Sequence, residues 1–216
     1  MTESLTTMLG EARAGAGEAG IVRGVSVAIV SQNKDPEGLG RVKLRFPWRE
    51  DPDESHWARI AVPMAGSGRG TWFLPEVGDE VLVAFESSRI EHPYVLGALW
   101  NGQDLPPERN ADGKNDLRVI HSRSGHRIVF DDGAQGRIEI HLKDRSRTVR
   151  IDPDGIAIKD DAGNEITIAS TPGNITLKSN VGVSIESTTV DIKAQASMTL
   201  QASGTLTIKG GLVLIN

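Results

Sequence analysis

The sequence predicts an all-β protein with an N-terminal OB-fold barrel and a C-terminal intertwined trimeric β-helix that forms a needle. Three observations predict this fold class. Short β-rich runs, separated by loops of Gly, Pro and Asp, fill residues 21–100. Beyond them, pairs of apolar residues one position apart recur at steps of 7 to 11 residues, the spacing of short strands with one buried face. Aromatic residues make up only 4% of the chain and end at Phe130, so the repeat must bury aliphatic side chains.

Residues 1–20 are expected to form a flexible tail because they are rich in Gly and Ala, with a short helix over Leu5 to Arg13. They lack the basic start and apolar stretch of a signal peptide, and no segment of the chain approaches the ~20 apolar residues of a membrane helix. We therefore expect a soluble protein that is assembled in the cytoplasm.

Residues 21–100 contain six apolar runs, and five or six short strands in about 80 residues predict a small barrel. The runs are VSVAIV, RVKLRF, ARIAV, TWFL, EVLVAF and YVLGAL. The first strand leads into a hairpin, and Gly66 to Gly70 is expected to form a flexible loop. This order favours an OB-like barrel.

Residues 101–116 are expected to be a linker, since they contain almost no apolar residue and two adjacent prolines. Residues 117–216 carry the repeat, in which each apolar pair marks one expected strand. The pairs are Ile128/Phe130, Ile138/Ile140, Val149/Ile151, Ile156/Ile158, Ile166/Ile168, Ile175/Leu177, Val183/Ile185, Val190/Ile192, Met198/Leu200 and Leu206/Ile208, and Leu214 begins an eleventh. From Ile166/Ile168 to Leu206/Ile208 the pairs are expected to form the axial core of the needle.

Two inward side chains per strand bury too little apolar area to offset the ordering entropy of about a hundred residues in a single chain. Three chains around a common axis would bury the pairs against each other and pair the strand edges between chains. At ~4.8 Å per strand, ten strands would give a rod roughly 50 Å long. The alternatives are a single-chain solenoid, and an ordinary sandwich, whose strands rarely keep so regular a period.

Two stretches of the barrel region resemble the central spike of contractile injection systems. They are GLGRVKLRFPW, Gly38 to Trp48, and HWARIAVPMAGSGRGTWFLPEVGDEVLVAFESSRIEHPYVLGALWNGQDLPP, His56 to Pro107. The family includes baseplate assembly protein V of contractile-tailed phages and the valine-glycine repeat protein G of type VI secretion. Its gly-arg-val-lys-val run (ending here in Leu44), trp-x-arg strand, pro-x-x-gly-x-gly-x-gly loop and pro-x-x-gly-x-glu-val turn occur in order. The resemblance covers about residues 24–107, whereas the needle matches by pattern only. It implies a barrel seated on a baseplate hub and a trimeric β-helical needle.

The departures from the family add expectations about partners. Only about 20 residues precede the barrel, so the hub domain of the secretion proteins is expected to be a separate protein. The linker leaves no room for a lysozyme-like insertion, and all five histidines precede residue 142, so an iron-bound tip is not expected. The resemblance implies that a small PAAR-type protein caps a blunt apolar end formed by Leu212, Val213, Leu214, Ile215 and Asn216.

Other candidate sites in the sequence have simpler explanations. Gly66 to Gly70 lacks the Gly-Lys-Ser/Thr of a phosphate loop, and Asp152 to Gly155 lacks most ligands of a calcium loop. His121, His126 and His141 with Asp131 and Asp132 follow no known metal or triad spacing. The chain has no cysteine, which excludes disulfides and thiolate metal sites.

Charged and aromatic residues are expected to serve packing and solvation. The basic residues Arg123, Arg127, Arg145, Arg147 and Arg150 interleave along the sequence with Asp131, Asp132, Asp144, Asp152 and Asp154, as in solvated charge ladders. Trp48, Trp57, Trp72 and Trp100 are expected to pack inside the barrel and at contacts between subunits.

The sequence therefore predicts a structural homotrimeric spike, with no enzymatic activity, cofactor or metal, at the baseplate of a contractile tail or injection system. Such a spike would pierce the envelope of a target cell and touch its membrane transiently. Two alternatives come from other function classes: a β-helical enzyme acting on polysaccharide, which would need a carboxylate pair in a groove, and an OB-fold nucleic-acid-binding protein. The net charge of −5 and the lack of a Lys/Arg run argue against nucleic acid as a partner.

Overall fold

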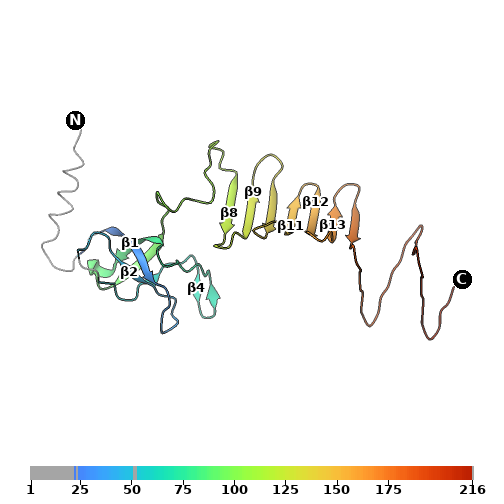
Figure 1. Cartoon of the computed structure of the whole chain (residues 1–216), viewed down its shortest axis with the longest axis horizontal. Helices are drawn as coiled ribbons and strands as arrows, with labels where there is room; N and C mark the ends of the chain where they lie inside the picture. Colours follow the sequence, from blue (N-terminus) through green and yellow to red (C-terminus); the bar gives the residue numbers. More distant parts are fainter. Residues whose placement is uncertain (1–21, 23, 51–52, 216) are drawn as a thin grey trace. The chain divides into compact units, whose positions relative to one another are not determined.

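The computed structural model describes residues 22, 24–50 and 53–215, which form two compact units. The first unit ends at Ala111 and the second begins at Asp112, within the segment 101–116 expected as a linker. Figure 1 shows the strands of each unit. The tail and helix expected in residues 1–20 lie outside the described residues.

The first unit is built on a five-stranded sheet in the order β2-β1-β6-β7-β3. Its strands are β1 (Val25–Gln32), β2 (Lys43–Arg45), β3 (Arg59–Ile60), β6 (Glu80–Phe85) and β7 (Pro93–Ala98). β3 and β7 are parallel and the other pairs antiparallel. Val42 beside β2 and Ala58 beside β3 exchange backbone hydrogen bonds of 3.0 and 2.7 Å, which join the two outer strands. The sheet is thereby closed into a barrel, as expected from the sequence.

Alternate residues of the strands fill the barrel interior, because successive side chains of a strand point to opposite faces. The core consists of Ala28, Val30, Val42, Leu44, Phe46, Ala58, Val81, Val83, Phe85 and Val95, each at most 9% exposed. Phe46 and Phe85 stack with their ring centroids 5.6 Å apart. This unit therefore closes its own hydrophobic core.

Residues 63–74 differ from the sequence prediction. The segment expected as a flexible loop at Gly66 to Gly70 contains a hairpin of β4 (Ala65–Gly66) and β5 (Arg69–Gly70). The run TWFL, Thr71 to Leu74, is not a strand, and both Trp72 and Phe73 are about 70% exposed (71% and 68%). Consecutive exposed side chains do not alternate across a sheet, so this apolar run lacks the pattern of a half-buried strand. A 3-10 turn, η1 (Glu86–Ser88), connects β6 to β7.

The loop between β1 and β2 is organised around Asp35. The Asp35 carboxylate accepts hydrogen bonds from the backbone N–H groups of Glu37, Leu39 and Arg41 and two from the Arg41 guanidinium, at 2.8 to 3.3 Å. The side chain is only 3% exposed. The Arg41 hydrogen bonds hold the pKa of Asp35 far below its usual range.

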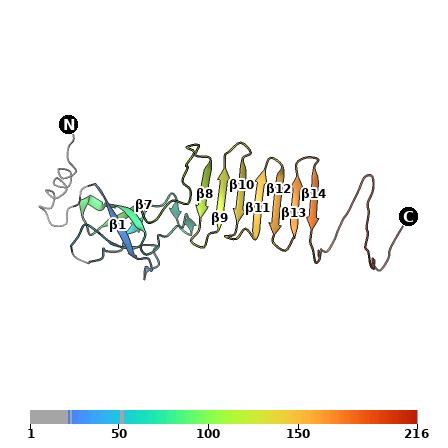
Figure 2. The same ribbon diagram turned by 45° about the horizontal axis from the view of Figure 1, so that its top comes forward.

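The second unit contains a seven-stranded antiparallel meander (Figure 2). Its strands are β8 (Leu117–His121), β9 (Arg127–Asp131), β10 (Arg137–His141), β11 (Arg147–Asp152), β12 (Gly155–Asp160), β13 (Glu165–Ala169) and β14 (Asn174–Lys178). Each strand pairs with the next one in sequence. The sequence missed β8, whose residues 118 and 120 are Arg and Ile rather than an apolar pair.

The strand register places the apolar pairs on one face of this sheet. Ile158, for example, lies opposite Val149 on β11 and Ile166 on β13, and Ile166 lies opposite Leu177. Two rows of seven residues result, thirteen of them apolar: Arg118, Phe130, Ile138, Ile151, Ile156, Ile168 and Ile175, and Ile120, Ile128, Ile140, Val149, Ile158, Ile166 and Leu177. We call this the apolar face and the opposite side the polar face.

Residues 179–215 form no hydrogen-bonded strand within the described chain, and they appear as an extended trace after β14 (Figure 1). The strands expected at Val183/Ile185, Val190/Ile192, Met198/Leu200 and Leu206/Ile208 are thus not formed by one chain alone, because no strand of the chain pairs with them. In residues 117–178 the hydrogen-bonding partners lie in the same chain, where the sequence analysis expected neighbouring chains. This corrects the expectation of pairing between chains for the first half of the predicted needle.

Candidate assembly surfaces

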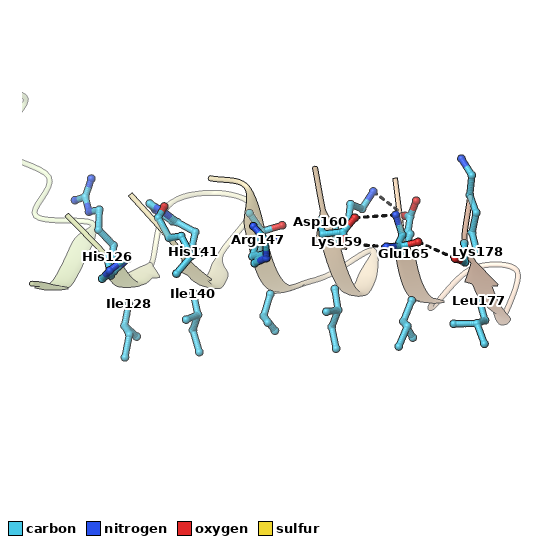
Figure 3. Close-up of a pocket in the computed structure, with 18 of the residues that line it drawn as sticks. His126, Ile128, Ile140, His141, Arg147, Lys159, Asp160, Glu165, Leu177 and Lys178 are labelled. Carbon is cyan, nitrogen blue, oxygen red and sulfur yellow. Dashed lines mark hydrogen bonds and ion pairs between the residues drawn. The ribbon is translucent and has the colours of Figure 1, made fainter. Parts of the chain in front are cut away.

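The apolar face is largely uncovered in the single chain. Ile140, Ile158, Ile166, Leu177 and Ile175 are 47, 45, 44, 57 and 77% exposed. One row lines an open groove of about 910 Å³. Figure 3 shows Ile128, Ile140 and Leu177 projecting to one side of the strands, while His141, Lys159 and Glu165 lie on the other side. A contiguous apolar surface of this kind marks a contact with another molecule.

Charged side chains cover the polar face near β10. Glu139 is 7% and His141 5% exposed. The Arg145 guanidinium donates to the Glu139 carboxylate at 2.7 Å, and Arg137 lies 3.1 Å from Asp131. The Nδ1 of His141 donates to the carbonyl of Leu142 at 2.8 Å. These contacts satisfy part of the buried polar groups within the same chain, whereas the Nε2 atom of His141, 3.7 Å from Glu139, is buried without a hydrogen-bond partner.

Ion pairs continue along the polar face toward β14. Lys159 contacts Glu165 on the adjacent strand at 2.7 Å, and Arg150 pairs with Asp152. The hydrogen bond from Lys159 is the main cause that lowers the pKa of Glu165, and the bond from Arg150 lowers the pKa of Asp152 in the same way. Cations of the same chain therefore favour the ionised form of Glu165 and Asp152.

The chain is anchored where it leaves β14. Asn180 donates its side-chain amide to the carbonyl of Ala162 at 2.6 Å, and the Ser179 hydroxyl bonds the side chain of Asn164 at 2.8 Å. A Cβ on Gly163 would meet the Asn180 side chain at 2.4 Å, so only glycine fits beneath it. Strand pairing ends abruptly after this anchor.

The residues expected in the distal axial core are exposed. Their exposed fractions range from 48 to 69%, for Val183, Ile185, Val190, Ile192, Met198, Leu200, Leu206 and Ile208. At the expected tip-docking residues Leu212, Val213, Leu214 and Ile215 the range is 46 to 89%, and Asn216 lies outside the described residues. The structure thus brings Ile166, Ile168, Ile175 and Leu177 together on one face, with Val183 beside Leu177 in the lining of the groove. The later residues are not placed on this face by strand pairing within the described chain.

Three of the four tryptophans lie on the barrel surface, so the expectation of packing inside the barrel is wrong for these three, while packing at contacts between subunits stays a prediction. Trp48, Trp72 and Trp100 are 51, 71 and 70% exposed. Trp72 lies over Gly40, where a Cβ would approach its ring to 2.8 Å, and the neighbouring Leu39 is 64% exposed. The barrel interior is filled mainly by valines, and its two aromatic rings are those of Phe46 and Phe85.

The remaining candidate sites are structural. Gly66 to Gly70 belongs to the β4–β5 hairpin, and Asp152 accepts the backbone N–H groups of Asp154 and Gly155 in a tight turn. Within the described residues, no group of three or more His, Asp or Glu side chains could hold a metal ion. Among those same residues, no helix has the length and apolarity needed to span a membrane.

The barrel can be compared with known proteins. Residues 26–100, which hold every strand of the five-stranded sheet except the first residue of β1, match the type VI secretion system/phage-baseplate injector OB domain. The barrel is thus similar to this injector OB domain. The OB fold expected from the sequence is thereby confirmed for the barrel, and the all-β class is confirmed for the described chain.

Curated relatives with spike-protein names match part of this chain. The chain is 32% identical over 106 residues to the type VI secretion system spike protein VgrG3 of Vibrio cholerae, and 29% identical over 135 residues to VgrG1b of Pseudomonas aeruginosa. A third relative is the actin cross-linking toxin VgrG1 of Vibrio cholerae, 32% identical over 111 residues. The matches cover 45, 58 and 48% of this chain but only 10, 17 and 10% of those proteins. The resemblance to central spike proteins of injection systems is confirmed.

Proposed function

We propose that this chain is the structural homotrimeric central spike at the baseplate of a contractile tail or injection system, where it pierces the envelope of a target cell. The observation that carries the proposal is an injector OB barrel joined in one chain to a sheet that exposes two apolar rows. The relatives' names support a role in secretion or injection machinery. Beyond what these names say, we propose that the spike contains three copies of the chain, contacts a hub protein and a tip protein, and acts mechanically.

The apolar face supports the trimer. Thirteen apolar side chains on seven strands remain partly exposed, and complete burial of each would contribute about 1 kcal/mol beyond its present burial. Three such sheets around an axis form a prism whose interior is filled by these side chains and whose polar faces meet water. Isoleucine, with its branched side chain, suits this pleated and tightly packed environment.

Residues 179–216 support pairing between chains beyond β14. Their apolar pairs keep the strand period, yet the single chain offers them no partner strand. Unpaired backbone groups and exposed apolar residues are both costly, so three chains that wind around each other would satisfy both requirements. Ile166 to Ile208 would then form one continuous axial core.

The two ends of the spike would contact different partners. The exposed Trp72 and Leu39 of the barrel would contact a hub protein of the baseplate, since exposed aromatic residues are frequent in protein contacts. Residues Leu212 to Asn216 would carry a PAAR-type tip protein, because the exposed apolar side chains of Leu212 to Ile215 need a cover. The spike would assemble in the bacterial cytoplasm and become part of a virion or injection particle.

The proposed action is mechanical and uses no catalytic residue or cofactor. Stacked strands transmit an axial push through many hydrogen-bond ladders at once, and the trimer would expose no strand edge along its length. The toxin relative shows that other proteins with this OB domain bear additional activities by name. We assign no such activity to the present chain.

The solution mass of the full chain tests the proposal. We expect light scattering to find a species of three 23.2 kDa chains that resists dissociation in unheated detergent. A well-folded monomer would overturn the trimeric spike. In that case, polysaccharide cleavage and salt-dependent binding of single-stranded nucleic acid would be assayed next, as the alternatives from the sequence require.

A further inference from the structure

The meander sorts charged residues that alternate in sequence onto two opposite edges of the sheet. Every second turn of a meander lies on the same edge. The turns at 122–126, 142–146 and 161–164 therefore share one edge, and those at 132–136, 153–154 and 170–173 share the other. We call these the first edge and the second edge. Each is a side of the sheet where the strands end in turns, and neither is one of the outermost strands β8 and β14.

The two edges carry opposite charge at the turns that join β8 to β12. On the first edge, the turns at 122–126 and 142–146 and their flanking strand ends contain Arg123, Arg127, Lys143, Arg145 and Arg147 against the carboxylate Asp144, whereas the third turn of this edge is acidic, with Asp160, Asp161 and Glu165. On the second edge, the turns at 132–136 and 153–154 and the strand ends beside them contain Asp116, Asp131, Asp132, Asp152 and Asp154 against Arg137, and Arg118 and Arg150 reach Asp132 and Asp152 from within their strands. The excess of positive charge on the first edge is therefore confined to its first two turns.

We propose that these edges are complementary docking surfaces between copies of this chain: the basic first edge of one copy lies against the acidic second edge of the next. This inference rests on the proposed trimer and adds what selects its arrangement. In a ring with threefold symmetry, each copy meets its neighbour through two different edges, so opposite charges face each other at all three corners. A twofold contact of an edge with itself would place like charges together and is disfavoured.

The positions of the turns along the threefold axis also favour this docking. Threefold symmetry places equivalent residues of the three copies at the same height along the axis, and successive turns of the two edges are offset by one strand, about 4.8 Å. A turn of the first edge therefore faces the gap between two turns of its neighbour's second edge. The turns of the two copies can interdigitate along each corner.

One pair of residues is placed for a direct contact. Lys143 stands in the β10–β11 turn, and a Cβ on Gly125 would lie 3.0 Å from its Cγ, so its stem runs over the β8–β9 turn. Its ammonium group therefore reaches the height of the β9–β10 turn on the neighbouring copy, which begins with Asp132. Within its own chain Asp132 pairs with Arg118 at 3.2 Å, but both side chains are more than half exposed (63 and 54%), so this pair contributes little.

A double-mutant cycle on the full-length trimer tests the contact. The variants are Lys143→Glu, Asp132→Lys and the two combined, and subunit exchange between differently labelled trimers measures dissociation at physiological salt. Each single reversal is expected to speed exchange about tenfold, since an exposed pair changes an equilibrium roughly two- to threefold and the trimer holds three copies. The combined variant is expected to exchange within about threefold of the unaltered protein, because the pair re-forms with reversed polarity.

The cycle separates contacts between chains from contacts within a chain. In one chain the two residues lie at opposite edges, about 17 Å apart for a strand of five residues, and that exceeds the screening length of about 8 Å at physiological salt. Lys34→Glu, on the exposed barrel surface, is the matched control and is expected to leave exchange unchanged. At 1 M salt the differences among the variants should disappear.

The possible results are distinct. Recovery in the combined variant supports docking through the edges, even if a single variant is too weak to remain a trimer. Additive losses without recovery, in a protein that is still a trimer, overturn the charged edges and leave the trimer intact. A monomeric unaltered protein overturns the proposed spike itself.

Discussion

The barrel and the seven-stranded sheet differ in how far a single chain buries their apolar residues. The barrel closes its sheet through the bridge between Val42 and Ala58, and ten core residues become at most 9% exposed. The sheet of β8 to β14 has two open faces, and Ile158 and Ile166 stay nearly half exposed (45 and 44%) although their strands are fully paired. Hydrogen bonding alone therefore does not complete the second unit.

The comparison teaches that a regular repeat can define its strands without defining its core. Every strand of the sheet finds its partner locally in sequence, whereas its apolar side chains stay partly exposed, and in the proposed trimer other copies cover them. The barrel should accordingly respond to core changes as a single chain does, and the sheet should respond through assembly.

The largest expected effect is the loss of the trimer on placing a charge on the apolar face. Leu177→Asp would place three carboxylates near the axis without partners, which costs several kcal/mol. We expect a mass of 23.2 kDa in place of three chains by light scattering. Thr176→Asp, on the polar face of the same strand, is the control and should remain trimeric; equal behaviour of the two variants would contradict the account.

A core substitution in the barrel should be the next largest effect. Leu44 is 0% exposed, and Leu44→Ala is expected to destabilise the barrel by about 2–5 kcal/mol through lost burial and a cavity. All four tryptophans lie in the barrel sequence, so urea unfolding followed by their fluorescence reports on this unit alone. Leu39→Ala, at a position that is 64% exposed, should change stability by at most about 0.5 kcal/mol. A Leu44→Ala midpoint equal to that of the unaltered barrel would rule out this core.

Acid should weaken the barrel through Asp35. The pKa of Asp35 is depressed in the folded state, mainly by its hydrogen bonds with Arg41. Its contribution to stability is therefore present above the unfolded pKa of about 4 and is lost as pH falls through the folded value. We expect the urea midpoint of the barrel to fall below pH 4, and that of Asp35→Asn to be lower at pH 7 and to depend less on pH. Parallel pH profiles for the two proteins would show that Asp35 does not have this role.

The smallest effect is expected on the polar face of the sheet. Lys159 and Glu165 form a cross-strand pair at 2.7 Å, with side chains 52 and 28% exposed. A double-mutant cycle to alanine should give a coupling of about 0.2–1 kcal/mol in thermal unfolding, and less at high salt. A coupling of several kcal/mol would mean that this face is shielded from solvent, which conflicts with its assignment as the outer surface.

Much of the fold could be predicted from apolar spacing. The pairs from Ile128/Phe130 to Ile175/Leu177 lie on β9 to β14, since side chains of alternating residues share a face. β8 was missed because its position in the first row is Arg118, which breaks the apolar pattern at the end of the sheet. The run TWFL was misread because local β propensity does not say whether a segment finds a partner.

The assembly surfaces were harder to predict. Which chain a strand pairs with is decided by turns and by the length of the meander, not by the period-2 pattern that both arrangements share. The segregation of Arg145 and Asp152 to opposite edges depends on counting turns, so it could not be read from charges that alternate in sequence. The packing of Trp72 on Gly40 is a contact between residues distant in sequence, so local sequence does not reveal it.

Thiol labelling of the assembled protein tests the central claim most directly. The chain has no cysteine, so Ile175→Cys and Thr176→Cys each introduce one thiol, on the apolar and the polar face of β14. In a single chain Ile175 is 77% exposed, so only other copies can protect it. We predict that maleimide labels residue 176 rapidly and residue 175 only after the trimer is dissociated. Equal, rapid labelling at both positions in the native protein would contradict the burial of the apolar face between copies.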